Sequence, residues 1–134
     1  MTRYAIDAVT TIRLLRDGVV ISDEHQLVAP NRLRSEALSI LYRAVRSGEL
    51  DDGDARVLLD GITTLRIRLL GDRVSRAAAW RIAAQLDWDD TSRAEYVAVA
   101  QLQADAFVTV DADLARAVRG IVPLAPFEAL SLSG

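Results

Sequence analysis

The stretch Ala106-Phe-Val-Thr-Val-Asp-Ala-Asp113 decides the fold class of this chain. Its first half is apolar and β-branched, which predicts a strand over residues 106–110, and a short helical pattern follows over residues 114–118. The same order occurs at the N-terminus, where residues 3–9 predict a short strand and residues 9–16 a helix. Strands that alternate with helices are typical of a parallel sheet covered on both faces.

The middle of the chain continues this alternation. Asn31 is a preferred N-cap residue, so we expect it to begin a helix that ends near Ser47. Ser92 and Glu95 have the spacing of a capping box, which predicts the start of an apolar, buried helix over residues 96–102. The sequence therefore predicts the α/β class, with a central, mostly parallel sheet flanked by helices. The remaining expected elements are strands over residues 26–30, 66–70 and 121–124 and helices over residues 51–65 and 72–86.

Length and composition narrow the function classes. With 134 residues, of which 51% are hydrophobic, the chain is expected to fold as one domain over residues 1–134. It has no cysteine, which excludes a disulfide framework, a thiolate zinc site and a cysteine nucleophile, and fits a cytoplasmic location. No apolar run reaches the length of a membrane span, so we expect no membrane association.

Arginine supplies all of the positive charge of the side chains. All 16 basic residues are arginine, so the chain has neither the lysine of a Walker-type phosphate loop nor that of a phosphoacceptor receiver domain. The net charge of −3 argues against bulk electrostatic binding to nucleic acid, but it leaves room for local phosphate contacts.

Two aspartates stand where this fold class binds ligands. Asp7 ends the first strand, and Asp111 ends the strand over residues 106–110. Ligands bind beyond the carboxyl ends of parallel strands, so the two carboxylates converge at one edge of the sheet if these strands are neighbours. Carboxylates held close together attract a hard divalent cation such as Mg²⁺ or Mn²⁺. The alternative is that each aspartate is an ordinary helix cap.

Glu36 is a third candidate acid. In the helix after Asn31 it falls at the edge of the apolar stripe, one position before Ala37, where a carboxylate faces a cleft. The alternative is a surface ion pair with Arg32, which lies four residues earlier on the same side of the helix.

These residues, in their order and spacing along nearly the whole chain, resemble a PIN domain. The resemblance rests on Asp7 after a short strand, on Pro30 followed by Glu36, and on Tyr96-Val-Ala-Val-Ala before Phe107-Val-Thr-Val-Asp-Ala-Asp-Leu-Ala. The chain length and the helix-rich middle are similar to the VapC-type toxins of bacterial toxin–antitoxin systems. The resemblance implies a PIN-like fold and a Mg²⁺- or Mn²⁺-dependent endoribonuclease that acts on RNA, is neutralised by a small antitoxin and forms a homodimer.

Carried over residue by residue, the family's first acid falls on Asp7 and its second on Glu36. The acid of its Thr-x-Asp strand end falls on Asp111, Thr109 matches the small hydroxyl residue, and Asp113 is the more variable last member. The resemblance implies that Asp7 and Asp111 hold the metal. Glu36 would bind it through water or position the nucleophile, and Asp113 would complete the shell. The implied reaction is hydrolysis of an RNA phosphodiester by a water activated on the metal.

Two positions depart from the family pattern. The family places an aspartate three residues before the aromatic of its buried helix, where this chain has Arg93, and Ser39 replaces its usual asparagine three residues after the second acid. Three explanations are open for Arg93: it turns outward to contact substrate phosphate, a nearby acid takes over the ligand role, or catalysis is weak or lost. In the last case the chain is a PIN-like module that binds RNA or antitoxin without cleavage. The candidate substitute acids are Asp89, Asp90 and Glu95.

An antitoxin of this kind would dock in an apolar groove. Leu58, Leu59, Ile62 and Leu65 form one apolar stripe at helical spacing and are the candidate lining. The same spacing is typical of a helix face in the core, and we favour that interpretation.

Overall fold

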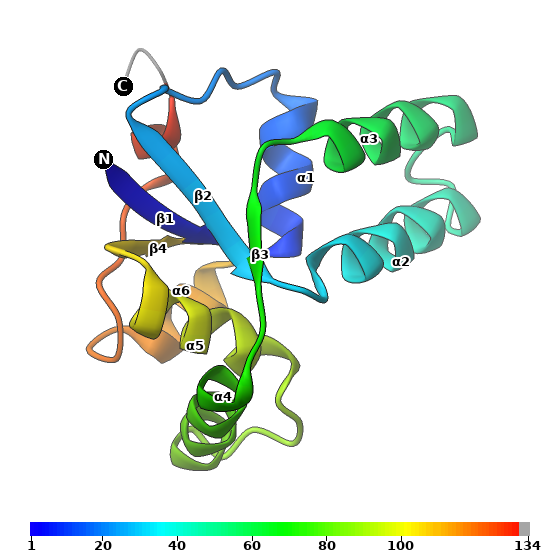
Figure 1. Ribbon diagram of the computed structural model, residues 1–134. Helices are drawn as coiled ribbons and strands as arrows, with labels where there is room; N and C mark the ends of the chain where they lie inside the picture. Colours follow the sequence, from blue (N-terminus) through cyan, green and yellow to red (C-terminus); the bar gives the residue numbers. More distant parts are fainter. Residues whose placement is uncertain (132–134) are drawn as a thin grey trace.

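The computed structural model describes residues 1–131, and a four-stranded, all-parallel sheet lies at its centre (Figure 1). The strand order is β3-β2-β1-β4, and helices flank the sheet. The predicted α/β class with a central parallel sheet is therefore confirmed, and the architecture is consistent with a PIN-like fold. The strands are β1 (Thr2–Ile6), β2 (His25–Pro30), β3 (Arg68–Leu70) and β4 (Ala106–Val108).

The helices form two groups around this sheet. Helix α5 packs against β1, β2 and β4, with α4 alongside it, while α2 and α3 form a hairpin that packs on α1 and projects to one side (Figure 1). In the described part of the chain no helix is long and apolar enough to span a membrane. The helices are α1 (Ala8–Arg16), α2 (Leu33–Arg46), α3 (Asp52–Thr64), α4 (Arg73–Gln85), α5 (Ser92–Gln103), α6 (Ala112–Val118) and the 3₁₀ helix η1 (Phe127–Leu130).

Both faces of the sheet are buried, as a parallel sheet between helices requires. Successive residues of a strand point to opposite faces, so neighbouring apolar residues enter two different clusters. The cluster on the α5 face is the larger, and the opposite cluster includes Leu14 of α1 and Leu130 of η1. The sheet residues are Ala5, Val28, Ala29 and Phe107 in the first cluster and Ile6, Leu27 and Val108 in the second, and Val28 and Ala29 are the exception to this alternation.

The strand order places the start and the end of the chain side by side. The chain builds β1, β2 and β3 outward in one direction and then crosses back, so that β4 pairs with the free edge of β1. Ile6 lies opposite Val108 in this pairing, which brings the carboxyl ends of β1 and β4 together. Such a reversal of strand order is the place where open α/β sheets bind ligands.

The predicted N-cap at Asn31 is wrong. Helix α2 begins at Leu33 with Arg32 at the cap position and without a side-chain cap bond. The backbone N–H of Asn31 instead donates to the carbonyl of Leu70 at 3.1 Å, because Asn31 still follows the pairing of β2 with β3. The helix therefore starts one residue later than its best capping residue predicts.

The predicted capping box at Ser92 and Glu95 is also wrong. Thr91 is the cap residue of α5, and the N–H of Ser92 donates to Asp90 Oδ1 at 2.9 Å. The carboxylate of Glu95 does not turn back to the helix start, because Arg32 engages it.

The predicted last strand over residues 121–124 does not form as a strand. It contributes two isolated parallel bridges, one between Leu124 and Phe107 of β4 and one between Val122 and Arg119. The carbonyl of Pro123 accepts from the N–H of Phe107 at 2.8 Å, and the N–H of Ala125 donates to the carbonyl of Phe107 at 3.0 Å. Pro123 has no N–H of its own, which limits how far this ladder extends.

Candidate functional site

Asp7 is a buried carboxylate at the carboxyl end of β1, with 6% of the residue exposed. It caps α1: Oδ1 accepts from the backbone N–H of Thr10 at 3.2 Å and from the Thr10 hydroxyl. Its other oxygen, Oδ2, accepts from the hydroxyl of Thr109 at 2.7 Å. Burial raises the pKa of Asp7 above its usual value, although the hydrogen bonds from Thr10 and Thr109 oppose this. Within residues 1–131 no cationic side chain pairs with this carboxylate.

Asp111 is joined to Asp7 through a single hydroxyl. Thr109 Oγ1, which donates to Asp7, also accepts from the backbone N–H of Asp111 at 3.1 Å. The Asp111 carboxylate caps α6, since its Oδ1 accepts from the N–H groups of Asp113 at 3.0 Å and Leu114 at 3.1 Å. Both aspartates are thus helix caps, as the alternative interpretation expected, and both stand at the same edge of the sheet.

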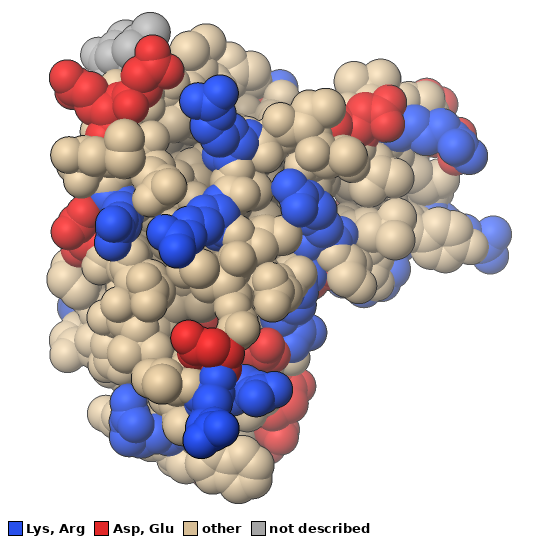
Figure 2. Space-filling view, viewed as in Figure 1, with Lys and Arg blue, Asp and Glu red and all other residues tan. Residues whose placement is uncertain are grey.

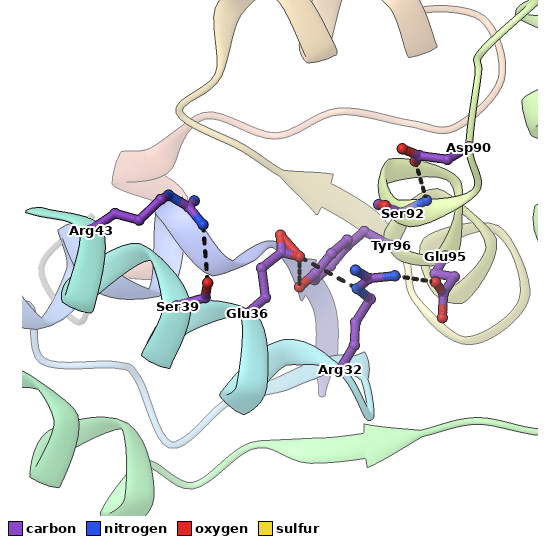
Figure 3. Close-up of polar contacts among 8 residues, drawn as sticks. All are labelled: Arg32, Glu36, Ser39, Arg43, Asp90, Ser92, Glu95 and Tyr96. Carbon is purple, nitrogen blue, oxygen red and sulfur yellow. Dashed lines mark hydrogen bonds and ion pairs between the residues drawn. The ribbon is translucent and has the colours of Figure 1, made fainter.

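Glu36 lies in a second group of polar side chains that joins α2 to α5 (Figure 3). The hydroxyl of Tyr96 donates to Glu36 Oε2 at 3.0 Å. The predicted ion pair with Arg32 is present at 3.5 Å, but the guanidinium reaches further and its Nη1 donates to Glu95 Oε2 at 2.5 Å. Arg32 therefore bridges two carboxylates from different helices.

Tyr96 is the buried member of this group. Burial and the charge of Glu36 raise the pKa of the Tyr96 hydroxyl well above its usual range, and the charge of Asp7 acts in the same direction. The hydroxyl is therefore protonated at neutral pH, as its hydrogen bond to Glu36 requires. The sequence signal for Tyr96 beyond the PIN resemblance is that it is a lone aromatic in a helix otherwise rich in Ala and Val.

The remaining candidate residues lie on the surface. Asp113 is paired with Arg116 of its own helix, and its side chain is 83% exposed. Asp90 accepts from the backbone N–H of Ser92. The side chain and then the backbone of Ser92, followed by the charges of Arg32 and Arg93, hold the pKa of Asp90 below its usual value.

Within residues 1–131, Arg93 forms no ion pair with Asp7, Glu36 or Asp111. Its guanidinium lies over the ring of Trp88, 4.3 Å from the ring centroid, and the residue is exposed. Of the substitute acids considered, Glu95 is the one that shares a partner, Arg32, with Glu36.

An open pocket of about 310 Å³ gives access to Glu36 from solvent. Arg43 donates to Ser39 at 3.0 Å on the next turn of α2, at the rim of this pocket (Figure 3). Arg32, Ser35, Glu36, Ser39 and Arg43 line it.

The Mg²⁺ or Mn²⁺ that the PIN resemblance implies would need acidic side chains that lie close together. Among residues 1–131 no three His, Asp or Glu side chains come together in a group that could hold a metal ion, so Asp7, Glu36 and Asp111 do not form one three-acid cluster. Mg²⁺ is, however, commonly held by one or two carboxylates together with water and substrate phosphate. Asp7, which is buried without a cation, and Asp111 next to it fit a site of this smaller kind.

Comparisons with known proteins give the fold. No protein-family model matches the chain, and no curated protein sequence matches it at a significant level. Among the solved structures that match is the crystal structure of PAE2754 from Pyrobaculum aerophilum, with a TM-score of 0.72 over 96% of this chain and 93% of that chain. The two sequences are 21% identical, so the likeness establishes a shared fold.

The apolar stripe on α3 packs mainly inward. Ile62 is 1% exposed in the larger core cluster, and Leu58 and Leu59 pack against that cluster, while Leu65 packs against the smaller one. The core interpretation of this stripe is therefore confirmed.

Proposed function

We propose that this protein is a PIN-like, Mg²⁺- or Mn²⁺-dependent endoribonuclease of the VapC toxin type, which acts in the cytoplasm as a homodimer and is neutralised by a small antitoxin. One observation carries the proposal. Asp7 is buried at the point where the strand order reverses, has no cationic partner in residues 1–131, and is joined through Thr109 to Asp111 at the end of the neighbouring strand. Burying a carboxylate without a cation lowers the stability of the folded protein. Ionisable groups that are perturbed in this way cluster at functional sites.

Each residue of the site has a distinct task in this proposal. Asp7 and Asp111 would hold the metal, which would supply an activated water and neutralise charge that develops on the phosphate. Thr109 fixes the orientation of Asp7, and the hydroxyl of Tyr96 fixes that of Glu36. Glu36 faces the open pocket, where it can accept a proton from the attacking water. Asp113 pairs with Arg116 at the surface, which supports a role at the margin of the site.

The pocket beside Glu36 suits a phosphodiester substrate. Arg43 and Ser39 at its rim offer a guanidinium and a hydroxyl, which are common partners of phosphate oxygens. The proposal does not need Arg93 in the site, because its charge is placed over Trp88.

A specific observation favours a second candidate function. Arg32 already supplies a positive charge to Glu36 and Glu95, in the way a bound cation would. On this alternative the chain is a catalytically weak or inactive PIN-like module that binds RNA or antitoxin without cleaving RNA.

Cleavage of a fluorogenic single-stranded RNA in the presence of Mn²⁺ tests the proposal. The natural protein should cleave it, and Asp7→Asn and Asp111→Asn should each lower the rate at least roughly a hundredfold, as loss of a metal ligand or of an electrostatic contact does. Asp60→Asn removes an exposed carboxylate from α3 and serves as the matched control. Absence of cleavage with retained RNA binding would favour the binding module, and absence of both would overturn the proposal.

A further inference from the structure

Helix α4 carries an exposed tryptophan on its outer face. Trp80 is 74% exposed, more than any other aromatic residue in the described part of the chain. The opposite side of the helix faces the core through Ala78, Ala79, Ile82 and Ala83. Leaving an indole in water forgoes a large gain from burial, so a tryptophan in this position marks a contact surface.

The neighbours of Trp80 leave its ring uncovered and add positive charge. Ala77 and Ala84 lie three residues before and four residues after it, and both are small and exposed. Arg73 and Arg76 are also exposed and project within about 40° of Trp80 around the helix axis, at roughly 100° per residue. The indole can therefore be stacked upon while guanidinium groups lie beside it.

The charge of this helix has one sign. Residues Arg73–Gln85 include three arginines, Arg73, Arg76 and Arg81, and no acid. The nearest acid before the helix, Asp72, is engaged in capping it with Ser75. In the space-filling view, arginine side chains gather over the part of the molecule where Figure 1 draws α4 (Figure 2). This local excess stands out in a chain whose net charge is −3.

The same helix reaches the candidate site. Arg76 and Glu95 line one pocket of about 170 Å³ at the carboxyl ends of β2 and β3. Glu95 pairs with Arg32, which in turn pairs with Glu36. The ion pair of Arg32 with Glu95 therefore links the lining of this pocket to that of the pocket beside Glu36.

We propose that the α4 face of Arg73, Arg76 and Trp80 is a binding track for single-stranded RNA, on which one base stacks on Trp80 while the arginines contact flanking phosphates. This inference rests on the proposed function and names the form of its substrate. Surfaces that bind single strands combine basic side chains along the backbone with aromatic rings that stack on bases. Duplex RNA offers its phosphates but no free base face, so it would leave the indole unused.

Equilibrium binding without divalent cations tests the track separately from cleavage. A fluorescently labelled 12-nucleotide single-stranded RNA is titrated with the full chain in EDTA, and its anisotropy gives the Kd. Trp80→Leu keeps an apolar side chain but removes stacking, and should weaken binding roughly tenfold. Trp80→Phe retains a ring and should recover most of the affinity. Bound RNA should quench the fluorescence of the natural protein and leave that of Trp80→Phe, in which Trp88 remains, almost unchanged.

The arginines are tested through salt dependence. Arg76→Gln should reduce the slope of log K against log salt by about 0.7, the value for one phosphate contact to a single strand. Arg56→Gln on α3 makes the same charge change on an exposed helix away from the track and should leave the slope unchanged.

Three results would overturn the inference: Trp80→Leu binds within twofold of the natural protein, a 12-base-pair duplex binds as tightly as the single strand, or polyglutamate displaces the RNA as well as unlabelled RNA does. The last result would show that α4 takes acidic protein segments. Loss of binding in Trp80→Leu with no cleavage by the natural protein would uphold the track and contradict the nuclease. If the natural protein and Trp80→Leu cleave RNA at the same rate, the result would uphold the nuclease and contradict the track.

Discussion

Thr109 donates a hydrogen bond to Asp7 across 102 positions of sequence, with 2.7 Å between Oγ1 and Oδ2. The same hydroxyl oxygen accepts from the backbone N–H of Asp111, so one side chain fixes the ends of β1 and β4 against each other. The contact orients a carboxylate whose other hydrogen bonds within residues 1–131 come from Thr10 of its own helix. The geometry of the candidate site therefore depends on Thr109 as much as on the acids.

Removing this hydroxyl should cost both stability and order at Asp7. Thr109→Ala leaves a buried carboxylate oxygen without its donor, which should lower the free energy of unfolding by about 1–3 kcal/mol. Because the bond lowers the pKa of Asp7, that pKa should rise further in Thr109→Ala. Urea denaturation and an NMR titration of the Asp7 carboxyl carbon measure the two effects. Thr109→Ser keeps the hydroxyl and should resemble the natural protein; equal losses in both variants would contradict the role of the hydroxyl.

The raised pKa of Asp7 makes stability depend on pH in a defined direction. Because burial raises this pKa above its value in the unfolded chain, the folded state binds the proton more tightly. The resulting stabilisation is fully present below the unfolded pKa and is lost as pH rises through the folded pKa. Asp7→Asn lacks this term and keeps a good capping residue, so it should gain stability relative to the natural protein as pH rises.

Thermal denaturation at a series of pH values measures this difference, with Asp60→Asn as the control for loss of an exposed carboxylate. A difference in Tm between Asp7→Asn and the natural protein that stays constant between about pH 4 and pH 8 would contradict the prediction. Added Mn²⁺ should raise the Tm of the natural protein and not that of Asp7→Asn, because only a ligand that binds the folded state stabilises it.

Local pattern was enough to predict the two aspartates at strand ends. The order of apolar strand, acid and helix is written in consecutive residues around Asp7 and Asp111, and both cap the helices that follow. The local sequence does not show whether their strands are neighbours, because parallel pairing joins distant segments through backbone bonds that any residue can make. In the structure the chain crosses back, β4 pairs with the free edge of β1, and the two strands are neighbours.

Contacts between side chains of distant helices could not be predicted from the local sequence. Glu95 has the spacing of a capping box, yet it pairs with Arg32, which is 63 positions away. A charged partner binds a carboxylate more strongly than a backbone N–H at a helix start, so the tertiary contact overrides the local motif. Asn31 does not cap α2 for a related reason, since its backbone N–H donates to the carbonyl of Leu70 in the sheet.

Arg93 should contribute to stability and not to the affinity for metal. Its guanidinium stacks on Trp88, which packs against the core, and such a contact contributes about 0.5–1 kcal/mol at an exposed site. Arg93→Gln should lower the free energy of unfolding by about that amount, while Arg93→Lys should retain part of the cation–π contact. Titration calorimetry should give the same Mn²⁺ affinity for Arg93→Gln as for the natural protein. A rise in that affinity would show that the charge of Arg93 reaches the acids.

Arg32 is the residue whose removal should most change the balance between nuclease and binding module. Its guanidinium lies against Glu36 and Glu95, with 36% of its side chain exposed, so solvent screens the pair and its contribution to stability is at most about 1 kcal/mol. The same positive charge opposes any cation that approaches these carboxylates. Arg32→Gln should therefore raise Mn²⁺ affinity roughly fivefold to tenfold, after solvent screening of the charge is allowed for.

The matched control is Arg43→Gln, which removes an equal charge on the same helix from a side chain that is hydrogen-bonded to Ser39 and to no carboxylate in residues 1–131. Calorimetry in low salt compares the two variants with the natural protein, and urea denaturation checks that both are folded. If Arg32 acts as an internal counter-ion, Mn²⁺ affinity rises in Arg32→Gln only. If instead it falls, Arg32 holds Glu36 in the position that the site needs, and it supports metal binding through geometry.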